Sequence, residues 1–415
     1  MSKSENVAVI GAGIVGVSTA IWLQRMGLKV TLIDREGPAA GTSFGNAGIL
    51  AASAVVPVTV PGLLQKAPGM LFSPSQPLFL RWSYLPRLMP FLMRYLSNAN
   101  LKDLKRISTD LHQLMYDCIE QHKALAEESG AAKYIGDPGY LHAYESEASF
   151  RKDSLAWETR RETGMEFEEL DADQLAEYDP ALAGKFGYAM LGRLDGRVTD
   201  PGAYVKALAN HFEAEGGEIL IAEVTDIMVK EGRATGVVTA EHGHVEATEI
   251  VVTAGAWSGV LARKLGIKVP LEAERGYHVE FVGANVNLRS PVMVTEKKFA
   301  MNSMDGRLRC AGIVEFGGLE AGPSKAPVEL LKNQVAEMFP DLKYEGTREW
   351  LGHRPSTPDS LPLIGAFEKV PNVWAGFGHQ HLGLTGAPKT GRWLANMISG
   401  EMPNVDMTPY SPDRF

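Results

Sequence analysis

The sequence predicts an α/β protein whose two domains are each assembled from separated stretches of the chain. Three observations predict this fold. A buried strand, a glycine-rich turn and a helix follow one another near the start of the chain, strand-like alternation fills residues 217–254, and a second glycine-rich segment at 376–391 leads into a final helix. With 415 residues, 45% of them hydrophobic, the chain can bury a sizeable core.

The first element is a β-α-β unit. Val7–Ile10 is an apolar run typical of a buried strand, the motif Gly-x-Gly-x-x-Gly follows at residues 11–16, and a helical pattern then continues to Gly27. A second strand, Lys29–Ile33, ends on Asp34. The order of strand, glycine turn, helix and acid indicates a dinucleotide site more strongly than the glycines alone.

Each residue of this motif has a physical role. Gly11, Gly13 and Gly16 permit the tight turn, the close approach of a pyrophosphate and the close packing of helix on strand. The helix N-terminus offers free N–H groups to the phosphates. Asp34, which follows Gly16 by 18 positions, would accept hydrogen bonds from the ribose hydroxyls. The alternative is a turn that uses its glycines for packing only.

Composition excludes several classes of protein. The net charge of −9 argues against a nucleic-acid partner, and two cysteines without a C-x-x-C pair argue against a disulfide framework. No run of eighteen apolar residues occurs, and the first residues lead directly into a strand, which leaves no room for a signal peptide. We therefore expect a cytoplasmic protein.

The remaining elements divide between two domains. A helix over Pro201–Glu215, capped by Asp200, precedes a β-meander with turns at 231–232 and 242–243, and the closing helix covers Ala387–Ser399. We expect residues 1–62, 170–262 and 348–415 to form the dinucleotide-binding domain and residues 63–169 and 263–347 to form the substrate domain.

Three further segments distinguish FAD from NAD. They are Thr42–Gly48, Val252–Ser258 and Gly376–Pro388, all rich in small residues that let backbone approach a flat ring. A helix N-terminus after the last segment would stabilise negative charge on a reduced flavin. The segment 42–48 taken alone fits an ordinary surface loop better, and only the other segments favour a cofactor contact.

Together these segments resemble the D-amino acid oxidase-like FAD-dependent oxidoreductase superfamily, and most of all the bacterial D-amino acid dehydrogenases. The matching pieces follow the family's order and span nearly the whole chain: VIGAGIVGVSTAIWLQRMGLKVTLIDRE, TSFGNAG, VVTAGAWS, GHRPSTPDSLPLIG and GHQHLGLTGAPKTG. The resemblance implies a Rossmann-like FAD-binding domain and an α+β substrate domain whose antiparallel sheet covers the flavin.

The resemblance also implies which residues hold FAD. These are Gly11, Gly13, Gly16, Asp34, Arg35, Ser43, Asn46, Ala47, Gly48, Val224, Ala254, Gly255, Trp257, Gly383, Leu384 and Thr385. Relatives with covalent flavin use a cysteine in the C-terminal part. Neither Cys118 nor Cys310 lies in a matching segment, so we expect non-covalent FAD. We expect no metal, because the pair His379 and His381 has no supporting carboxylate or cysteine spacing.

Oxidation of an amino acid by a flavin requires one fixed cation for the substrate carboxylate. Arginine suits this role because its planar guanidinium can donate two parallel hydrogen bonds to a carboxylate. Arg354, at the start of a loop in GHRPSTPD, is the leading candidate, with a salt bridge to Asp359 as the alternative. Tyr277 would hydrogen-bond the substrate or lie in the core. His379 would line the pocket or anchor backbone.

The expected activity is oxidative deamination of D-amino acids. A hydride passes from Cα to flavin N5, giving an imino acid and then a 2-oxo acid and ammonia, with electrons passed to a respiratory acceptor, a quinone or carrier. One alternative is oxidation of secondary amino acids (glycine, sarcosine, D-proline or hydroxyproline). Another is a non-catalytic flavin-binding or NAD-binding regulator.

The stretch 78–96 is strongly apolar but contains three arginines and two prolines. These residues exclude a membrane span, and the prolines are expected to break any long amphipathic helix. A helix pair buried on the substrate domain is one interpretation. The resemblance favours another, in which this stretch makes a peripheral contact with the inner face of the cytoplasmic membrane.

Overall fold

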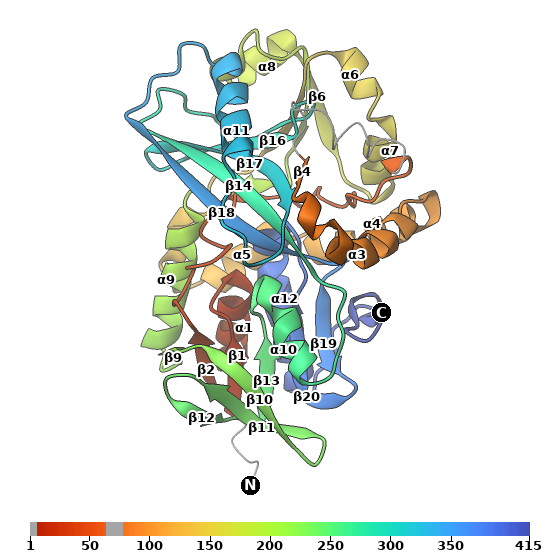
Figure 1. Cartoon of the computed structure of the whole chain (residues 1–415). Coiled ribbons are helices and arrows are strands. Elements are labelled where there is room, and N and C mark those ends of the chain that lie inside the picture. The colour runs from red at the N-terminus through yellow and green to blue at the C-terminus, as the bar shows by residue number, and fades with distance from the viewer. Residues whose placement is uncertain (1–5, 64–77) are drawn as a thin grey trace.

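The computed structural model describes residues 6–63 and 78–415. Its lower half in Figure 1 is built on a six-stranded sheet, and its upper half on a larger second sheet. The first sheet comprises β1 (Asn6–Ile10), β2 (Lys29–Asp34), β9 (Glu218–Ile221), β13 (Glu249–Val252), β19 (Leu363–Phe367) and β20 (Val370–Phe377). Its order is β19-β20-β13-β1-β2-β9, and only β19 runs antiparallel to its neighbour.

Both faces of this sheet are covered. On one face α1 (Ile14–Arg25) packs closely against α12 (Gly383–Ile398) and against α9 (Pro201–Ala214). On the other face lie α10 (Ser258–Lys264) and the meander β10 (Val224–Lys230), β11 (Arg233–Thr239) and β12 (Gly243–Glu246). The predicted β-α-β unit, the capped helix after Asp200 and the meander are confirmed.

The closing helix begins four residues earlier than predicted. We expected it to start at Ala387, but α12 begins at Gly383 and includes Pro388. Pro388 is the sixth residue of α12, so the helix accommodates it in its second turn with the loss of one possible backbone hydrogen bond. The glycine-rich segment therefore forms the first turn of the helix itself.

The second sheet is mixed rather than wholly antiparallel. Its order is β18-β14-β17-β16-β15-β5-β7-β6, with β4 paired to β17. The pairs β5–β15 and β4–β17 are parallel and the others antiparallel. The strands are β4 (Leu78–Leu80), β5 (Tyr140–Tyr144), β6 (Phe167–Asp171), β7 (Tyr188–Gly192), β14 (Glu272–Val282), β15 (Val292–Val294), β16 (Phe299–Met304), β17 (Arg307–Phe316) and β18 (Gly346–Ser356).

Helices and a short strand pair complete the structure. The helix α11 packs on β14 and β17 above the second sheet (Figure 1). The strands β3 (Ile49–Leu50) and β8 (Gly196–Arg197) form a separate pair. The remaining helices are α3 (Leu85–Ser97), α4 (Leu101–Met115), α5 (Cys118–Ala126), α6 (Glu147–Arg151), α7 (Ser154–Glu162), α8 (Ala172–Tyr178) and α11 (Lys325–Met338).

The two sheets do not divide at the predicted domain boundaries. Strand β7 belongs to the second sheet although residues 170–262 were assigned to the first domain. Strand β18 likewise extends past position 348 as part of the second sheet. Residues 1–5 and 64–77, which were also assigned to domains, lie outside the described residues. The predicted division otherwise stays a prediction.

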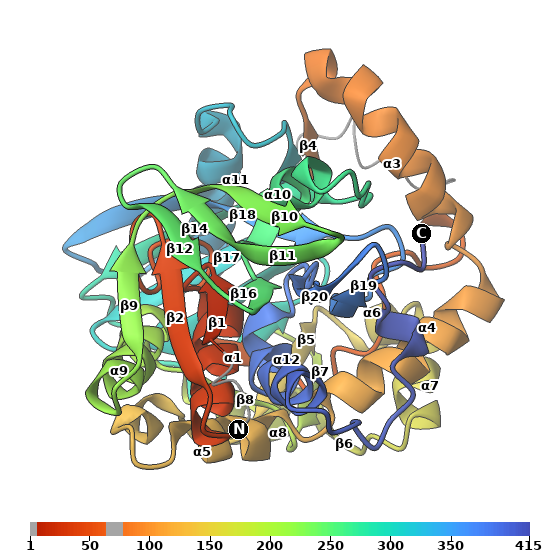
Figure 2. The ribbon, with the colours of Figure 1, turned by 90° about the horizontal axis from the view of Figure 1, so that it is seen from below.

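The apolar stretch 78–96 forms β4, a short 3₁₀ turn and α3. Leu88, Phe91 and Tyr95 on one face of α3 pack against Phe316, so the stretch is anchored to the second sheet. Figure 2 shows α3 at the margin of the molecule. The expectation that prolines break a helix here is wrong, because Pro86 lies in the first turn of α3 and Pro90 is accommodated inside it.

The outer side of this stretch carries exposed apolar side chains. Met93 is 68% exposed and Trp82 is 56% exposed. Within residues 6–63 and 78–415, no helix has the length and apolar character needed to cross a bilayer. A peripheral membrane contact through this stretch stays a prediction.

Substitution of Gly16 tests the packing of the β-α-β turn. A Cβ at this position would lie 1.8 Å from the Gly11 carbonyl oxygen, which is backbone and cannot move aside. Gly16→Ala is expected to lower the free energy of unfolding by about 1–3 kcal/mol, as overpacking does. Denaturant unfolding measures this change. Gly346→Ala is the control, because no atom lies near the added Cβ, and equal stabilities for the two variants would contradict the argument.

Candidate functional site

The end of β2 and the start of α1 create a preformed polar turn. Asp34 is fixed by backbone: its Oδ2 accepts the N–H of Ala12 at 2.8 Å, and its Oδ1 accepts two further N–H groups at 2.9 Å each. Gly11 has φ +105°, and a Cβ there would lie 2.6 Å from the Thr253 carbonyl oxygen. Both the conformation and the close contact therefore require glycine.

A cavity opens at this turn, along the carboxyl ends of the parallel strands, where α/β sheets usually bind their ligands. The predicted cofactor residues that line it are Gly11, Gly13, Asp34, Arg35, Ser43, Asn46, Val224, Ala254, Gly255, Trp257, Gly383 and Leu384, and His379 lines it as well. The Arg35 guanidinium stacks 4.5 Å from the centre of the Trp257 ring. Segments from three distant parts of the chain thus meet at one cavity.

Four predicted cofactor residues do not line the cavity. Gly16 provides the close packing beneath the turn, and Gly48 has φ +74° with a Cβ position 2.4 Å from the Val198 carbonyl oxygen. The Thr385 hydroxyl accepts the N–H of Ala51 at 3.2 Å. Ala47 accepts a hydrogen bond through its carbonyl. Direct contact of these four with the cofactor stays a prediction.

Side chains of the second sheet hydrogen-bond to the backbone of segment 42–48. Arg309 on β17 donates to the Phe44 and Asn46 carbonyls, with the first distance 3.0 Å. His278 Nδ1 lies 2.9 Å from the Gly45 carbonyl oxygen, and Asn302 donates to the Ala47 carbonyl at 2.9 Å. This segment is therefore part of the interface between the two sheets and not an ordinary surface loop.

A buried ionic cluster fixes Arg309 in turn. Its Nε and Nη2 donate to Glu280 Oε1 at 2.9 and 2.6 Å, and Arg307 Nε donates to the same oxygen at 2.7 Å. Burial alone would raise the pKa of Glu280, but the two guanidinium groups outweigh it and lower that pKa. No pattern in the sequence identifies this cluster, since nothing in an alternating strand marks which of its charged residues face inward.

Other cavity residues also escaped prediction. Pro355 and Gln380 lie within the quoted segments GHRPSTPDSLPLIG and GHQHLGLTGAPKTG, but no local signal distinguishes them from their neighbours. Ala222, Val260 and Leu261 are apolar residues outside the quoted segments. The fold brings these residues together at the turn after β1. Within the described chain, no group of three His, Cys, Asp or Glu side chains is placed to hold a metal ion.

Arg354 lies within β18 and not at the start of a loop, as was predicted. Its side chain extends over Gly276 of the neighbouring strand, where a Cβ would be 2.5 Å from the guanidinium carbon. The group is half-buried, and burial lowers its pKa. It makes no hydrogen bond or ion pair with any residue of 6–63 or 78–415. The Arg354 guanidinium is thus a cation without a described counter-ion, and the next residue, Pro355, lines the cavity.

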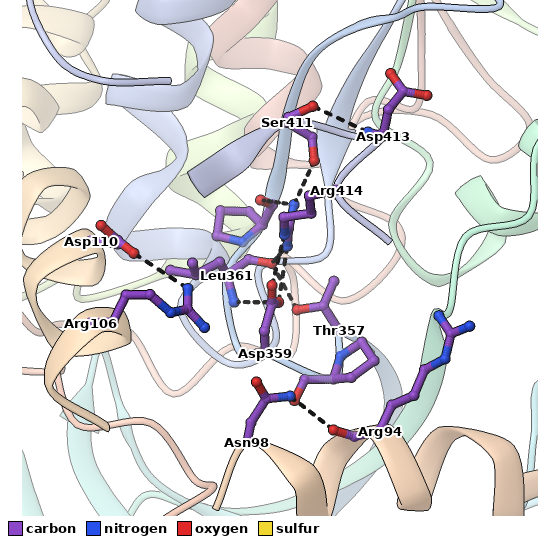
Figure 3. Close-up of polar contacts among 12 residues, drawn as sticks. Arg94, Asn98, Arg106, Asp110, Thr357, Asp359, Leu361, Ser411, Asp413 and Arg414 are labelled. Carbon is purple, nitrogen blue, oxygen red and sulfur yellow. Dashed lines mark hydrogen bonds and ion pairs between the residues drawn. The ribbon is translucent and has the colours of Figure 1, made fainter. Parts of the chain in front are cut away.

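The alternative salt bridge between Arg354 and Asp359 is wrong. Asp359 instead pairs with Arg414 near the C-terminus, with Nε to Oδ2 at 2.7 Å and Nη2 to Oδ1 at 2.9 Å (Figure 3). Arg414 also donates to the carbonyls of Leu361 and Pro362. This ion pair between Asp359 and Arg414, called the C-terminal latch below, holds the segment after β18 and leaves Arg354 without Asp359 as a partner.

The other predicted catalytic side chains have structural partners. The Tyr277 hydroxyl donates to Glu315 at 2.7 Å and is 1% exposed. His379 Nε2 lies 2.9 Å from the Thr390 hydroxyl, and burial lowers its pKa to about 3. His381 is accessible, yet the surrounding protein and the charge of Arg354 lower its pKa to about 4. Both histidines are neutral at neutral pH.

This fold and cavity are those of a dinucleotide-binding protein, and comparison with known proteins specifies the class. The chain matches the FAD dependent oxidoreductase family over residues 6–397 and belongs to it. It is 39% identical to a D-amino-acid oxidase of Bradyrhizobium diazoefficiens, with all of both chains aligned. It is 30% identical to a D-amino acid dehydrogenase of Dechloromonas aromatica, covering 96% of this chain and 98% of the relative.

Solved structures show the same fold. Glycine oxidase from Geobacillus kaustophilus superposes with a TM-score of 0.75 at 21% identity, covering 99% of each chain. The predicted α/β architecture, with a parallel Rossmann-like sheet and a second substrate-domain sheet, is therefore confirmed. At this identity the likeness concerns the fold alone.

Removal of the C-terminal latch tests its contribution to stability. Arg414→Gln leaves the partly buried Asp359 without its counter-ion and frees two backbone carbonyls. We expect the free energy of unfolding to fall by about 2–4 kcal/mol, in the range for a broken buried pair. Arg151→Gln breaks an exposed pair with Glu147 and is expected to cost less than about 0.5 kcal/mol. Denaturant unfolding measures the free energy of unfolding of both variants. A similar small change in both would contradict a stabilising role for the C-terminal latch.

Proposed function

We propose that this protein oxidises D-amino acids to imino acids, which hydrolyse to 2-oxo acids and ammonia. FAD, when bound, supplies the acceptor for the hydride that leaves Cα. The observation that carries the proposal is the guanidinium of Arg354, a partly exposed cation with no described protein partner, next in sequence to the cavity residue Pro355. The names of the relatives support D-amino acids as the substrate class.

The residues of this chain provide binding and orientation. Arg354 would bind the substrate carboxylate through its planar fork, which sets the position of Cα. The Gly11–Gly16 turn and the start of α12 present backbone N–H groups at the cavity, where they would bind anionic parts of the cofactor. Asp34 would bind the ribose hydroxyls. The cavity residues therefore fit the cofactor of the family.

We propose that FAD is bound without a covalent bond. Cys118 packs in the core beside α12, and Cys310 lies in the core of the second sheet. Both thiols are buried, and burial raises the pKa of each, so neither is available as a thiolate. Neither cysteine lines the cavity.

The proposed electron acceptor is a respiratory quinone or carrier rather than oxygen. Relatives named as dehydrogenases support this acceptor, while the 39% identical relative is named as an oxidase. The exposed apolar side chains of residues 78–96 would suit a peripheral membrane contact near such an acceptor. Comparison of the reoxidation rates of the reduced flavin by oxygen and by a soluble quinone distinguishes the two acceptors.

Anaerobic reduction of the flavin tests the proposed activity. The purified yellow protein is mixed without oxygen with D-alanine, L-alanine, glycine, sarcosine or either enantiomer of proline. We expect D-alanine to bleach the flavin absorbance and L-alanine to leave it unchanged. Acid precipitation should release the flavin into the supernatant. Bleaching by sarcosine or proline but not by D-alanine would contradict the proposed substrate class.

Substitution of Arg354 tests its role in substrate binding. Arg354→Ala is expected to raise the KM for D-alanine at least about 30-fold, since truncating one partner of a buried charge pair costs about 2–5 kcal/mol. Flavin content should not change. Arg348→Ala, on the same strand but exposed, is the control and should leave KM unchanged. An unaltered KM in the Arg354 variant would remove this residue from the site.

A further inference from the structure

A carboxylate lies directly across the sheet from Arg354. Glu274 on β14 is the register partner of Arg354 on β18, and the two side chains share one face of the sheet. Opposed residues of paired strands have Cβ atoms about 4.5–5.5 Å apart. Glu274 is 7% exposed, so this face of the sheet holds two opposite charges on neighbouring strands.

These two charges do not form an ion pair. No nitrogen of Arg354 lies within 4.0 Å of an oxygen of Glu274. The Arg354 side chain extends over Gly276, whereas Glu274 lies beside Ser356, in the opposite direction along the paired strands. The side chains therefore diverge and leave a gap between a fixed positive and a fixed negative group.

The surroundings of Glu274 add no second cation. Tyr95 on α3 faces it, and the pKa of Tyr95 is raised by burial and by the charge of Glu274. Glu272, two residues earlier on β14, accepts a hydrogen bond from Tyr84 at 3.0 Å. Burial raises the pKa of Glu274, against the opposing effects of Arg354 and Ser356. Arg354 is thus the one cation among the described groups that face this carboxylate.

Two separated opposite charges match the two ends of a zwitterion. An α-amino acid carries a carboxylate and an ammonium group on the same carbon, so one molecule can pair with both groups at once. We infer that Glu274 binds the substrate ammonium group and accepts its proton, while Arg354 holds the carboxylate. This inference rests on the proposed function and adds a catalytic residue to it.

The proton transfer produces the form of the substrate that can be oxidised. One N–H bond of the ammonium breaks, its electron pair stays on nitrogen, and the proton forms an O–H bond on the Glu274 carboxylate. The neutral amine then has the lone pair that assists loss of hydride from Cα. A raised pKa makes Glu274 a better proton acceptor than an ordinary glutamate.

Glu274→Gln keeps the shape of the side chain and removes its charge. Stopped-flow measurement of anaerobic flavin reduction by D-alanine, as a function of pH, is the test. At neutral pH we expect the reduction rate of the variant to fall about 100-fold, within the range for lost acid–base catalysis. The rate should recover above the pKa of the substrate ammonium, because the amine is then neutral before it binds. This recovery also shows that the variant is folded.

Glu272→Gln is the matched control, because Glu272 lies on the same strand and face with the same 7% exposure but is bonded to Tyr84. Its pH profile should coincide with that of the unaltered protein. Coincident profiles for the Glu274 variant and the unaltered protein would overturn the inference. A fall in the flavin reduction rate seen only with D-lysine and D-arginine would also overturn it, because Glu274 would then bind the substrate side chain and not the ammonium group on Cα.

A second measurement uses the unaltered protein. D-lactate has the carboxylate but no ammonium group, so ionised Glu274 should oppose its binding, and its inhibition should weaken as pH rises through the pKa of Glu274. Inhibition independent of pH in that range would overturn the inference. Absence of flavin reduction by every amino acid in the unaltered protein would contradict the proposed function itself, whereas reduction with an unaltered profile in the variant contradicts Glu274 alone.

Discussion

Arg354 is a half-buried positive charge without a bound protein anion, and such a group is costly to desolvate. The sheet tolerates it for three reasons: Gly276 leaves room for the guanidinium, Glu274 balances the charge from a distance, and the group stays partly exposed. The neighbouring acid that would neutralise it, Asp359, is bound by Arg414. The protein thus preserves an unsatisfied cation, which is the electrostatic requirement for binding a carboxylate.

The cofactor cavity and this cation belong to different sheets, and their relative position depends on the contact between the sheets. Arg309, His278 and Asn302 bind the carbonyls of segment 42–48, while Ser43 of the same segment accepts the N–H of Ile14 at the start of α1 at 2.9 Å. One short segment therefore touches both the dinucleotide turn and the substrate-domain sheet. Its glycines and small side chains serve the close packing that this double contact requires.

Local patterns predicted most of the first domain because its signals are local. The glycine turn, the acid after β2, the meander turns and the cap at Asp200 each depend on neighbours within a few residues. Other features depend on residues that are 27–107 positions apart in the sequence, and no local pattern predicts them. These features are the position of Arg354 on a strand, the pairing of Asp359 with Arg414 and the Glu280 cluster. The start of α12 also differs from the prediction, because the glycine-rich residues before Ala387 already adopt the helical conformation.

A crystal structure with FAD and α-aminoisobutyrate tests the central claim most directly, because this zwitterion has no hydrogen on Cα and cannot be oxidised. The account predicts both carboxylate oxygens paired with the Arg354 guanidinium and the ammonium group directed at Glu274. An analogue bound with its carboxylate elsewhere, and Arg354 still without an anion, would contradict it.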